Sequence, residues 1–377
     1  MEMINVQTSI NKEESGFRDL KFDRLVDSVK GRRVAMAVSG GADSLLSLVL
    51  LKESGAEVVA VHGVFISSEH SEKAVSGLSR RCAELDVEFH SLDLVSDFNQ
   101  MVVEPFVTDY LIGKTPNPCA RCNPAIKFGK IFAACEKYGA SMLGTGHYVR
   151  IAEHSDFGKV LVRGADSGKD QSYFLSLVPS EKLHKAVFPL GGMSKKAVYE
   201  ELEKREIEIP LPSESQEICF VPDDDYRLFL QNKGVQLPEG GKIILSDGRQ
   251  VGRHEGLWRY TQGQRKGLGI AWSEPLYVLD KEVNENTLVV GTRNELDSYG
   301  CTASGANILV DHELWPAEVL LQTRYRQKAK PAKVVVDGEF LKFEFLEPHT
   351  RPTPGQIAAV YSNDGAVLAG GVIEKES

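Results

Sequence analysis

The chain has no long apolar run, and this absence excludes a membrane-spanning class of protein. No uninterrupted apolar stretch among its 377 residues approaches the roughly 18 residues that a spanning helix needs. The first residues, MEMINVQTSINKEESGF, are polar and lack the apolar core of a secretion signal. We therefore expect a cytoplasmic protein with no membrane partner, in which residues 1–30 form a flexible N-terminal extension.

Cysteine is also scarce, with six residues in the whole chain. Without an export signal, so few cysteines argue against a disulfide scaffold and favour reduced thiols used for chemistry or for metal binding. Basic charge is not in excess either, since the formal net charge is −9. That value argues against a uniformly basic nucleic-acid surface, but it leaves room for a local basic face.

The composition and length indicate a globular protein of two or three domains. The content of 42% hydrophobic and 26% charged residues is ordinary for such a protein, and the length exceeds that of one domain. Residues 33–150 alternate apolar strand-like runs with helical segments, which predicts a parallel sheet covered on both faces. After about residue 228 short β-rich runs separated by Gly and Asp turns predict a mainly β C-terminal part.

A turn that suits phosphate binding follows the first apolar run, RVAMAV. Its sequence is SGGADS, from Ser39 to Ser44, and an apolar helix follows. Gly40 and Gly41 let a phosphate approach the backbone closely, and free N–H groups at the helix start favour negative charge. Asp43 is suited to orient a metal ion. The lysine of a Walker turn and the G-x-G-x-x-G pattern of nicotinamide sites are both missing, and the alternative is an ordinary tight turn.

Cys119 and Cys122, in TPNPCARCN, admit several interpretations. A zinc site needs two more ligands at suitable spacing, and the chain has no second C-x-x-C. A thioredoxin-type pair lies at a helix start, whereas Pro116 and Pro118 predict a rigid loop here. Nearby cations, such as Lys127, are expected to stabilise a thiolate. Cys82, Cys135 and Cys301 are best interpreted as small buried apolar residues.

Beyond these local patterns, SGGADS resembles the pyrophosphatase loop of the ATP-pyrophosphatase (PP-loop) superfamily, whose members adenylate an oxygen atom and release pyrophosphate. The segments TPNPCARCNPAIKFG, GTGHYVR, GKDQSYFLSL, FPLGGMSKKAV, SQEICFVPDDDY, GLWRYTQGQRKGLGI, TRYRQ and TPGQ follow in the order found in bacterial tRNA-specific 2-thiouridylases. The resemblance covers roughly residues 33–372. It implies ATP-dependent transfer of sulfur to position 2 of the wobble uridine in tRNAs for Lys, Glu and Gln.

The resemblance also implies an α/β fold in three parts. A PP-loop catalytic domain with a parallel sheet is expected over residues 31–227. A small β-rich central domain is expected over residues 228–290, and a C-terminal β-barrel that binds tRNA over residues 291–377.

The same resemblance assigns a role to individual positions. Cys219 is expected to carry sulfur as a persulfide, and Cys122 to free that sulfur or attack the persulfide. ATP, together with Mg²⁺, is expected along Ala37, Val38, Ser39, Gly40, Gly41, Ala42, Asp43, Ser44, Ile66 and Gly146. tRNA is expected at Asn117, Pro118, Cys119, His147, Lys169, Asp170, Gln171, Arg324, Tyr325 and Gln356. The sulfur donor is a relay protein, a cysteine desulfurase or sulfide, and the enzyme is expected to be a monomer.

This chain departs from the family pattern at two places. Many members have Asp where this chain has Cys119, so three cysteines are expected around one site. Three thiolates can hold a [4Fe–4S] cluster at Cys119, Cys122 and Cys219, and such a cluster is the alternative to a persulfide relay. The segment after Ile66 lacks the Lys-Asn-Trp run of relatives, which leaves the adenine contacts undefined.

Two basic segments near the C-terminus, RYTQGQRKGLG and TRYRQKAKPAK, mix cations with tyrosine, a composition that suits a phosphate backbone and stacked bases. Two competing functions remain open at this point. One is another PP-loop enzyme, such as an amide-forming synthetase, which has no need of Cys122 and Cys219. The other is a non-catalytic tRNA-binding or iron–sulfur protein.

Overall fold

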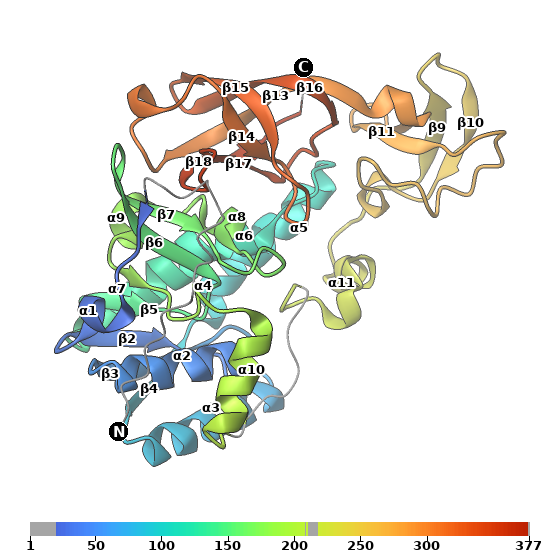
Figure 1. The fold of residues 1–377 in the computed structure, drawn as a ribbon. Coiled ribbons are helices and arrows are strands. Elements are labelled where there is room, and N and C mark those ends of the chain that lie inside the picture. Colours follow the sequence, from blue (N-terminus) through green and yellow to red (C-terminus); the bar gives the residue numbers. More distant parts are fainter. Residues whose placement is uncertain (1–19, 208, 210–217, 376–377) are drawn as a thin grey trace.

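The computed structural model describes residues 20–207, 209 and 218–375. Figure 1 shows an α/β unit at the lower left, a β-barrel above it, and a small sheet at the upper right beyond helix α11 (Tyr226–Asn232). The N-terminal extension expected over residues 1–30 lies mostly outside the described residues.

A five-stranded parallel sheet forms the centre of the α/β unit, with strand order β4-β3-β2-β5-β8. In β2 the side chains of Val34, Ala35 and Met36 are fully buried, as expected for a strand covered on both faces. The strands are β2 (Arg33–Ala37), β3 (Glu57–Val64), β4 (Glu88–Asp93), β5 (Met142–Gly144) and β8 (Ala186–Val187).

Helices cover this sheet and supply the segments that carry the site. Helix α2, which follows the phosphate-type turn, buries all its residues from Ser44 to Leu51. The longer helices are α2 (Ala42–Glu53), α3 (Glu69–Glu84), α5 (Glu104–Leu111) and α10 (Lys195–Lys204). Shorter helices are α1 (Leu25–Val29), α4 (Val95–Phe98), α6 (Pro118–Cys122), α7 (Phe132–Lys137), α8 (Ser172–Leu175) and α9 (Ser180–Leu183), with π-helical segments at Asn99–Val103 and Asn123–Ile131.

The barrel is closed, with strand order β13-β16-β15-β14-β17-β18. Closure leaves no free sheet edge among these strands, because β18 pairs back to β13. The strands are β13 (Asp297–Ile308), β14 (Val319–Gln322), β15 (Lys330–Asp337), β16 (Phe340–Thr350), β17 (Ile357–Tyr361) and β18 (Val367–Ile373).

The barrel and the α/β unit share a hydrophobic core. One cluster of buried residues includes Phe106 and Phe132 of the α/β unit together with Ile357 and Tyr361 of the barrel. A hairpin of β6 (Val149–His154) and β7 (Gly158–Arg163), with β1 (Leu20–Lys21) beside β6, contributes Ala152, Val160 and Val162 to a second cluster with the barrel, while Val149 and Leu161 belong to the first. We therefore expect the two units to move as one body.

The small central sheet differs because it has a core of its own. Its strand order is β10-β9-β12-β11, and residues such as Ile243, Val278 and Leu288 form a separate buried cluster. The strands are β9 (Gly241–Leu245), β10 (Gln250–His254), β11 (Tyr277–Glu282) and β12 (Thr287–Gly291).

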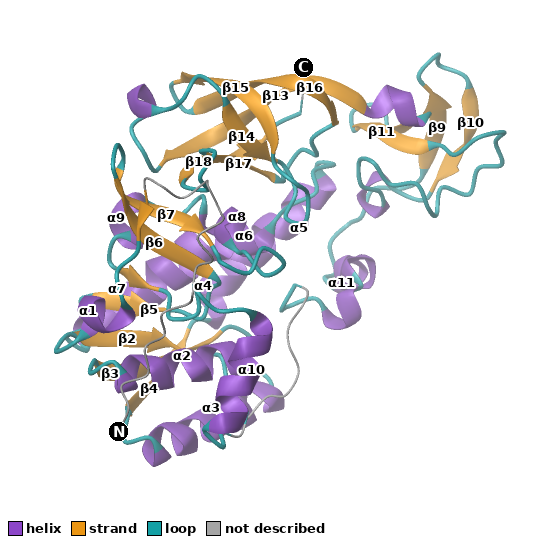
Figure 2. Cartoon of the chain, in the orientation of Figure 1, coloured by secondary structure: helices purple, strands orange, loops and turns teal. Residues whose placement is uncertain are grey.

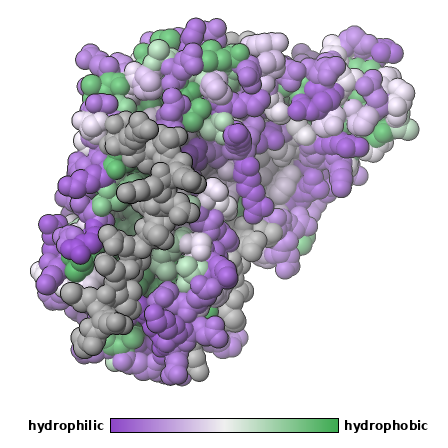
Figure 3. Space-filling model, viewed as in Figure 1, coloured by the Kyte–Doolittle hydropathy of each residue, from purple (hydrophilic) through white to green (hydrophobic). Residues whose placement is uncertain are grey.

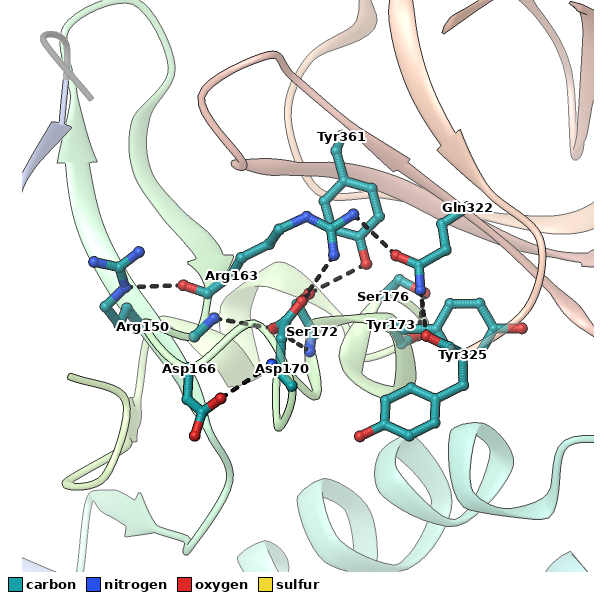
Figure 4. Close-up of polar contacts among 12 residues, drawn as sticks. Arg150, Arg163, Asp166, Asp170, Ser172, Tyr173, Ser176, Gln322, Tyr325 and Tyr361 are labelled. Carbon is teal, nitrogen blue, oxygen red and sulfur yellow. Dashed lines mark hydrogen bonds and ion pairs between the residues drawn. The ribbon is translucent and has the colours of Figure 1, made fainter. Parts of the chain in front are cut away.

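Polar contacts also connect β7 to the barrel (Figure 4). The Arg163 guanidinium lies over the ring of Tyr361, 3.5 Å from its centroid, and donates to Gln322 at 2.9 Å. It also forms an ion pair of 2.8 Å with Asp170, which is buried. Ser172 donates to the same carboxylate at 2.8 Å, so the pair belongs to a hydrogen-bonded network and not to an isolated contact.

These observations confirm the fold class expected from the sequence. Apart from one-turn helices, the barrel and the central sheet consist of strands and loops (Figure 2). In the part expected to be mainly β, β11 pairs with β12 and β15 with β16 as antiparallel hairpins. The face shown in Figure 3 is mostly hydrophilic. Among the described residues, every helix is too short or too polar to cross a membrane.

Candidate nucleotide and thiol site

The turn after β2 forms a compact loop whose own hydroxyls fix its shape. Gly40 has φ +89°, a value that strains residues with a Cβ. The Ser39 N–H donates to the Ser44 hydroxyl at 3.1 Å, and that hydroxyl donates to the Gly41 carbonyl at 3.0 Å. Gly41 is the N-cap of α2 and offers no capping side chain. The first amides of α2 therefore have no side-chain partner in the turn and can meet an anion.

A second loop approaches this turn closely. It follows β5, which pairs with β2 on the side opposite β3. The direction of chain winding thus reverses between β2 and β5, and in open α/β sheets the crevice outside the carboxyl ends at such a point is where ligands bind. Gly146 lies there: a Cβ on it would meet the Asp43 carbonyl carbon and the Ser44 nitrogen, each at 3.2 Å. This close approach explains why glycine suits position 146.

Asp43 is held by two side chains from other parts of the chain. The Lys195 ammonium, on the first residue of α10, lies 2.8 and 2.9 Å from its two carboxylate oxygens. The Tyr148 hydroxyl donates to one of these oxygens at 2.6 Å. The metal-orienting role expected for Asp43 therefore requires that Lys195 first release the carboxylate.

His62 on β3 contacts the backbone at the residue that precedes the turn. Its Nδ1 lies 2.7 Å from the Val38 carbonyl oxygen, and the side chain is buried. Burial lowers the pKa of His62, so the ring is neutral at physiological pH and its Nδ1–H donates to that carbonyl. Ile66, expected beside the nucleotide, follows the end of β3 and is exposed.

The cysteine pair lies on a helix and not in a loop, so the expectation of a rigid loop was wrong. Helix α6 begins at Pro118, and the Asn117 side chain caps it by accepting from the Ala120 N–H at 3.1 Å. Proline is well accommodated at the first helical position, because the missing N–H has no helical partner there. Cys122 ends α6, and a π-helical segment follows immediately.

The structure brings together cysteines that are 97 residues apart in sequence. The Cys122 thiol interacts electrostatically with those of Cys119 and Cys219, and Cys219 interacts with Cys119. Cys122 is buried, Cys119 is partly exposed, and Cys219 is exposed although protein surrounds much of its thiol. All six cysteines are free thiols, and Cys82, Cys135 and Cys301 are buried as expected.

The expectation that this setting favours thiolate was also wrong for the structure described here. Burial raises the pKa of all three thiols, and that of Cys122 to about 12. Lys127 acts in the opposite direction on each of them, but its effect is smaller than that of burial. At neutral pH the three cysteines are therefore protonated.

One short loop connects the thiols with the phosphate-type turn. Gly146 contacts Asp43, as described above, while the next residue, His147, places Nε2 3.4 Å from the Lys127 ammonium. His147 is buried, and both burial and Lys127 keep its pKa well below the usual value. Its Nδ1 pairs with the Thr145 hydroxyl at 2.8 Å. The two parts of the site thus share the loop Thr145–Tyr148.

The barrel holds the segment that leads into α6. The Gln356 amide donates to the Thr115 carbonyl at 2.9 Å and to the Pro116 carbonyl at 3.3 Å. The Thr115 N–H donates to the Pro354 carbonyl at 2.8 Å, and Lys114 pairs with Glu374 at 2.8 Å. We call these contacts the barrel clamp. They fix the position of the cysteine helix relative to the barrel.

Comparisons with known proteins identify the family. The chain is 51% identical over 346 residues to a tRNA-specific 2-thiouridylase of Nitratidesulfovibrio vulgaris, covering 90% of this chain and 99% of the relative. It is 46% identical over 350 residues to the enzyme of the same name from Lawsonia intracellularis, covering 91% and 99%. The chain belongs to the tRNA-specific 2-thiouridylase family.

Models of protein families match three consecutive parts of this family member. A tRNA methyl transferase HUP domain matches residues 32–223, its PRC-barrel domain residues 228–292, and an aminomethyltransferase β-barrel domain residues 298–373. Among solved structures, the U34-tRNA thiolase NcsA of Methanococcus maripaludis matches with TM-score 0.36 and 17% identity, over 58% of this chain and 68% of that one. A similarity at that level does not indicate the function of this chain.

The residues expected at tRNA divide into buried and partly accessible groups. Asp170 is committed to the Arg163 network, and the Gln171 side chain accepts from the Tyr148 N–H at 3.0 Å. Arg324 donates to the Gln262 carbonyl and the Thr353 hydroxyl at 3.0 and 2.8 Å. Tyr325 packs against a ring of α8, and Lys169 is partly exposed. Direct contact of these residues with tRNA stays a prediction.

The iron–sulfur cluster, the alternative to a persulfide relay, does not fit the thiols as they are arranged here. Within residues 20–207, 209 and 218–375 no three His, Cys, Asp or Glu side chains are grouped so that they could hold a metal ion. Cys119, Cys122 and Cys219 interact electrostatically without forming such a group.

Sequence reasoning missed Lys195, Tyr148 and His62, and it left Lys127 without a specific partner. Tyr148 and Lys195 lie within quoted family segments, but 105 and 152 residues separate them from Asp43, so no local pattern connects them to it. His62 is one residue in an apolar strand and appears structural from sequence. Only the packing of the sheet reveals what these side chains contact.

Proposed function

We propose that the protein is a tRNA-uridine 2-sulfurtransferase that uses ATP to activate the C2 oxygen of a wobble uridine and replaces that oxygen with sulfur. The observation that carries this proposal is the shared loop Thr145–Tyr148. It packs against the phosphate-type turn through Gly146 and faces the cation beside the thiols through His147. An activating site and a sulfur site are thus adjacent.

The residues at the turn fit ATP. Gly146 leaves space that a Cβ would fill, and Gly40 adopts a backbone that places the turn against the start of α2. Ser39 and Ser44 add hydroxyls, and the helix N-terminus favours a phosphate group. Mg²⁺ would be bound through Asp43 once Lys195 has released its two oxygens.

The thiols supply the sulfur chemistry. The uridine C2 oxygen attacks the α-phosphorus of ATP, and the bond to pyrophosphate breaks. The terminal sulfur of a Cys219 persulfide then attacks C2, and AMP leaves with the electron pair of the C2–O bond. Attack of Cys122 on the Cys219 sulfur forms a disulfide and leaves the second sulfur on C2. An external thiol reductant must reduce this disulfide before a sulfur donor loads Cys219 again.

The high pKa of Cys122 bears on this sequence, because the thiolate and not the thiol is the nucleophile. We propose that tRNA binding changes the surroundings of the thiol, and that Lys127 is the cation that then favours the thiolate. A persulfide on Cys219 is more acidic than a thiol, so the transfer to C2 needs less activation than the loading step or the last step, in which a cysteine thiolate is the nucleophile.

The remaining features follow the resemblance. We propose tRNAs for Lys, Glu and Gln as substrates, a monomeric enzyme and a cytoplasmic location. The donor is a relay protein or desulfurase that carries persulfide sulfur, or sulfide that attacks Cys219 in the Cys122–Cys219 disulfide in place of the reductant and so leaves a Cys219 persulfide and a Cys122 thiol. Cys119 in place of the usual Asp is a local substitution beside Cys122, with its thiol partly exposed. Of the three residues proposed to contact tRNA there, Asp170 belongs to the network of Figure 4, and Lys169 and Gln171 flank it in the sequence.

The test is thiolation of unmodified tRNA with ATP and a persulfide donor. Two quantities are measured, the pyrophosphate released and the 2-thiouridine content of the tRNA. We expect both products with wild type, and pyrophosphate alone when no sulfur donor is added. An amide-forming synthetase would release pyrophosphate without tRNA, and a non-catalytic binding protein would release none. Either result contradicts the proposal. Iron content of the anaerobically purified protein separates the relay from a cluster: thiolation by an iron-free protein supports the relay.

A further inference from the structure

Lys195 has no role in the chemistry described so far, although it lies against the phosphate-type turn. Its ammonium contacts both carboxylate oxygens of Asp43 at 2.8 and 2.9 Å, and its side chain is only 13% exposed. Helix α10 delivers it from 152 residues further along the chain. A partly buried lysine held at a phosphate loop is a candidate ligand for the phosphate.

The turn itself lacks the cation that such a site needs. Between Val38 and Ser44 the one charged residue is Asp43, which is negative. Pyrophosphate groups carry several negative charges, and an anion that enters beside an uncompensated carboxylate is repelled. Neutral donors from the turn and from α2 do not offset this charge. A cation beside Asp43 does so, and Lys195 is already there.

We infer that Lys195 binds the pyrophosphate part of ATP, moving from Asp43 to the phosphate when the nucleotide enters. The inference rests on the proposed ATP-dependent function. It assigns to this chain a mobile phosphate-binding lysine in the place of the fixed lysine of a Walker turn.

The surroundings permit this movement. The backbone of Lys195 is anchored, since its N–H donates to Asp166 at 3.0 Å and Ser194 caps the helix. The four-carbon side chain can therefore swing while its base stays fixed. Asp43 keeps a donor when the lysine leaves, because the Tyr148 hydroxyl remains 2.6 Å from it. Release of Lys195 thus leaves one Asp43 oxygen hydrogen-bonded to Tyr148, and water can reach the other because the Asp43 side chain is 32% exposed.

A purely structural role is the alternative, in which Lys195 only ties α10 to α2. Both roles predict some loss of stability when Lys195 is replaced, so stability does not decide between them. Affinity for phosphate-containing ligands does. AMP carries only the α-phosphate, whereas pyrophosphate and ATP carry the part that leaves in adenylation.

The experiment compares Lys195→Met with Lys196→Met by calorimetric titration of the full chain with pyrophosphate, ATP and AMP, with divalent metal chelated. Lys196 is the matched control, because its side chain is 86% exposed and pairs with Glu200 on the same helix. We expect Lys195→Met to weaken pyrophosphate and ATP binding about tenfold or more and to change AMP binding less than about twofold. Lys195→Arg should recover part of the loss, and Lys196→Met should behave as wild type.

A double variant, Asp43→Asn with Lys195→Met, separates contact from charge neutralisation. If Lys195 only neutralises Asp43, removing both charges restores pyrophosphate affinity, and the inference is overturned. If Lys195 contacts phosphate, affinity stays low. Equal pyrophosphate binding by Lys195→Met and wild type also overturns it. Failure of wild type to bind ATP would instead overturn the proposed function, and the inference with it.

Discussion

The phosphate-type turn and the thiol site are built in opposite ways. The turn is one continuous strand, loop and helix, and its shape depends on hydrogen bonds among Ser39, Gly41 and Ser44. The thiol site combines α6, the segment at Cys219 and the shared loop Thr145–Tyr148, and the barrel clamp holds it from a further unit. A local structure survives changes elsewhere in the chain, whereas an assembled one depends on distant packing.

This difference predicts which substitutions impair nucleotide binding and which impair sulfur transfer. Damage to the turn should affect nucleotide binding alone. Damage to the barrel should affect sulfur transfer, because Gln356 fixes the segment before Cys119, and leave the nucleotide unaffected. The shared loop is the one element whose alteration should reach both sites.

The largest expected effect comes from removing one thiol. Cys122→Ser and Cys219→Ser should each lower 2-thiouridine formation by about 10³-fold or more, because each thiol forms a different bond in the proposed sulfur transfer. ATP affinity should stay within about twofold of wild type, since the turn contains neither residue. Thiouridine quantified by mass spectrometry and ATP titration are the two measurements.

Cys82→Ala is the matched control for the thiol variants. Cys82 is buried on α3 in the cluster behind the sheet, away from the thiol site. Its replacement should leave thiolation unchanged. Wild-type thiolation by Cys122→Ser would show that the two sites are not related as proposed.

A methyl group on the shared loop should have the next largest effect. In Gly146→Ala the new Cβ lies 3.2 Å from backbone atoms of Asp43 and Ser44, so the turn must shift by a few tenths of an ångström. We expect ATP affinity to fall about tenfold, since small displacements of a preorganised site have large effects. Gly252→Ala is the control, because its nearest neighbour lies at 3.6 Å. Unchanged ATP affinity in Gly146→Ala would contradict the placement of the nucleotide.

The sequence predicted the turn more completely than the thiol site. The strand RVAMAV, the glycine pair and the apolar helix are local signals, and each was confirmed as part of the fold. The interpretation of Cys82, Cys135 and Cys301 as small buried apolar residues was also correct. What the sequence did not predict at the turn, namely Lys195 and Tyr148 on Asp43, comes from segments more than 100 residues away.

At the thiol site the family resemblance named the cysteines, but their environment followed from packing. Pro116 and Pro118 suggested a loop, yet Pro118 occupies the first position of α6, where proline suits a helix. Lys127 suggested stabilised thiolates, yet burial outweighs its charge and raises the pKa of each thiol. The burial of a residue depends on the whole fold. Local composition therefore predicted a lowered thiol pKa, whereas the pKa is raised.

The barrel clamp provides a test of whether the thiol site can be disturbed without disturbing the phosphate-type turn. Gln356→Met removes two hydrogen bonds to the carbonyls of Thr115 and Pro116 and keeps the side-chain size similar. We expect kcat for thiolation to fall about tenfold, because α6 loses a fixed position, while ATP affinity remains within about twofold. Gln231→Met, on the exposed surface of α11, is the control.

Binding of tRNA distinguishes the clamp from the direct contact expected at Gln356. If this residue only positions α6, the Kd for tRNA stays near that of wild type while kcat falls. A weakened Kd with unchanged kcat would favour direct contact with tRNA. Loss of ATP binding in this variant would show that the two sites are not independent.

The smallest effect should come from the charge beside the thiols. Because burial raises the pKa of the exposed Cys219 thiol, its alkylation by iodoacetamide should accelerate continuously from pH 7 to 9 without a plateau. Lys127 lowers that pKa, so Lys127→Met should raise it further and slow alkylation about threefold at pH 8. Lys130→Met, three residues along and paired with Asp97, is the control. Peptide mass spectrometry follows Cys219 alone, and a plateau below pH 8 would mean that its thiol is more acidic than the structure indicates.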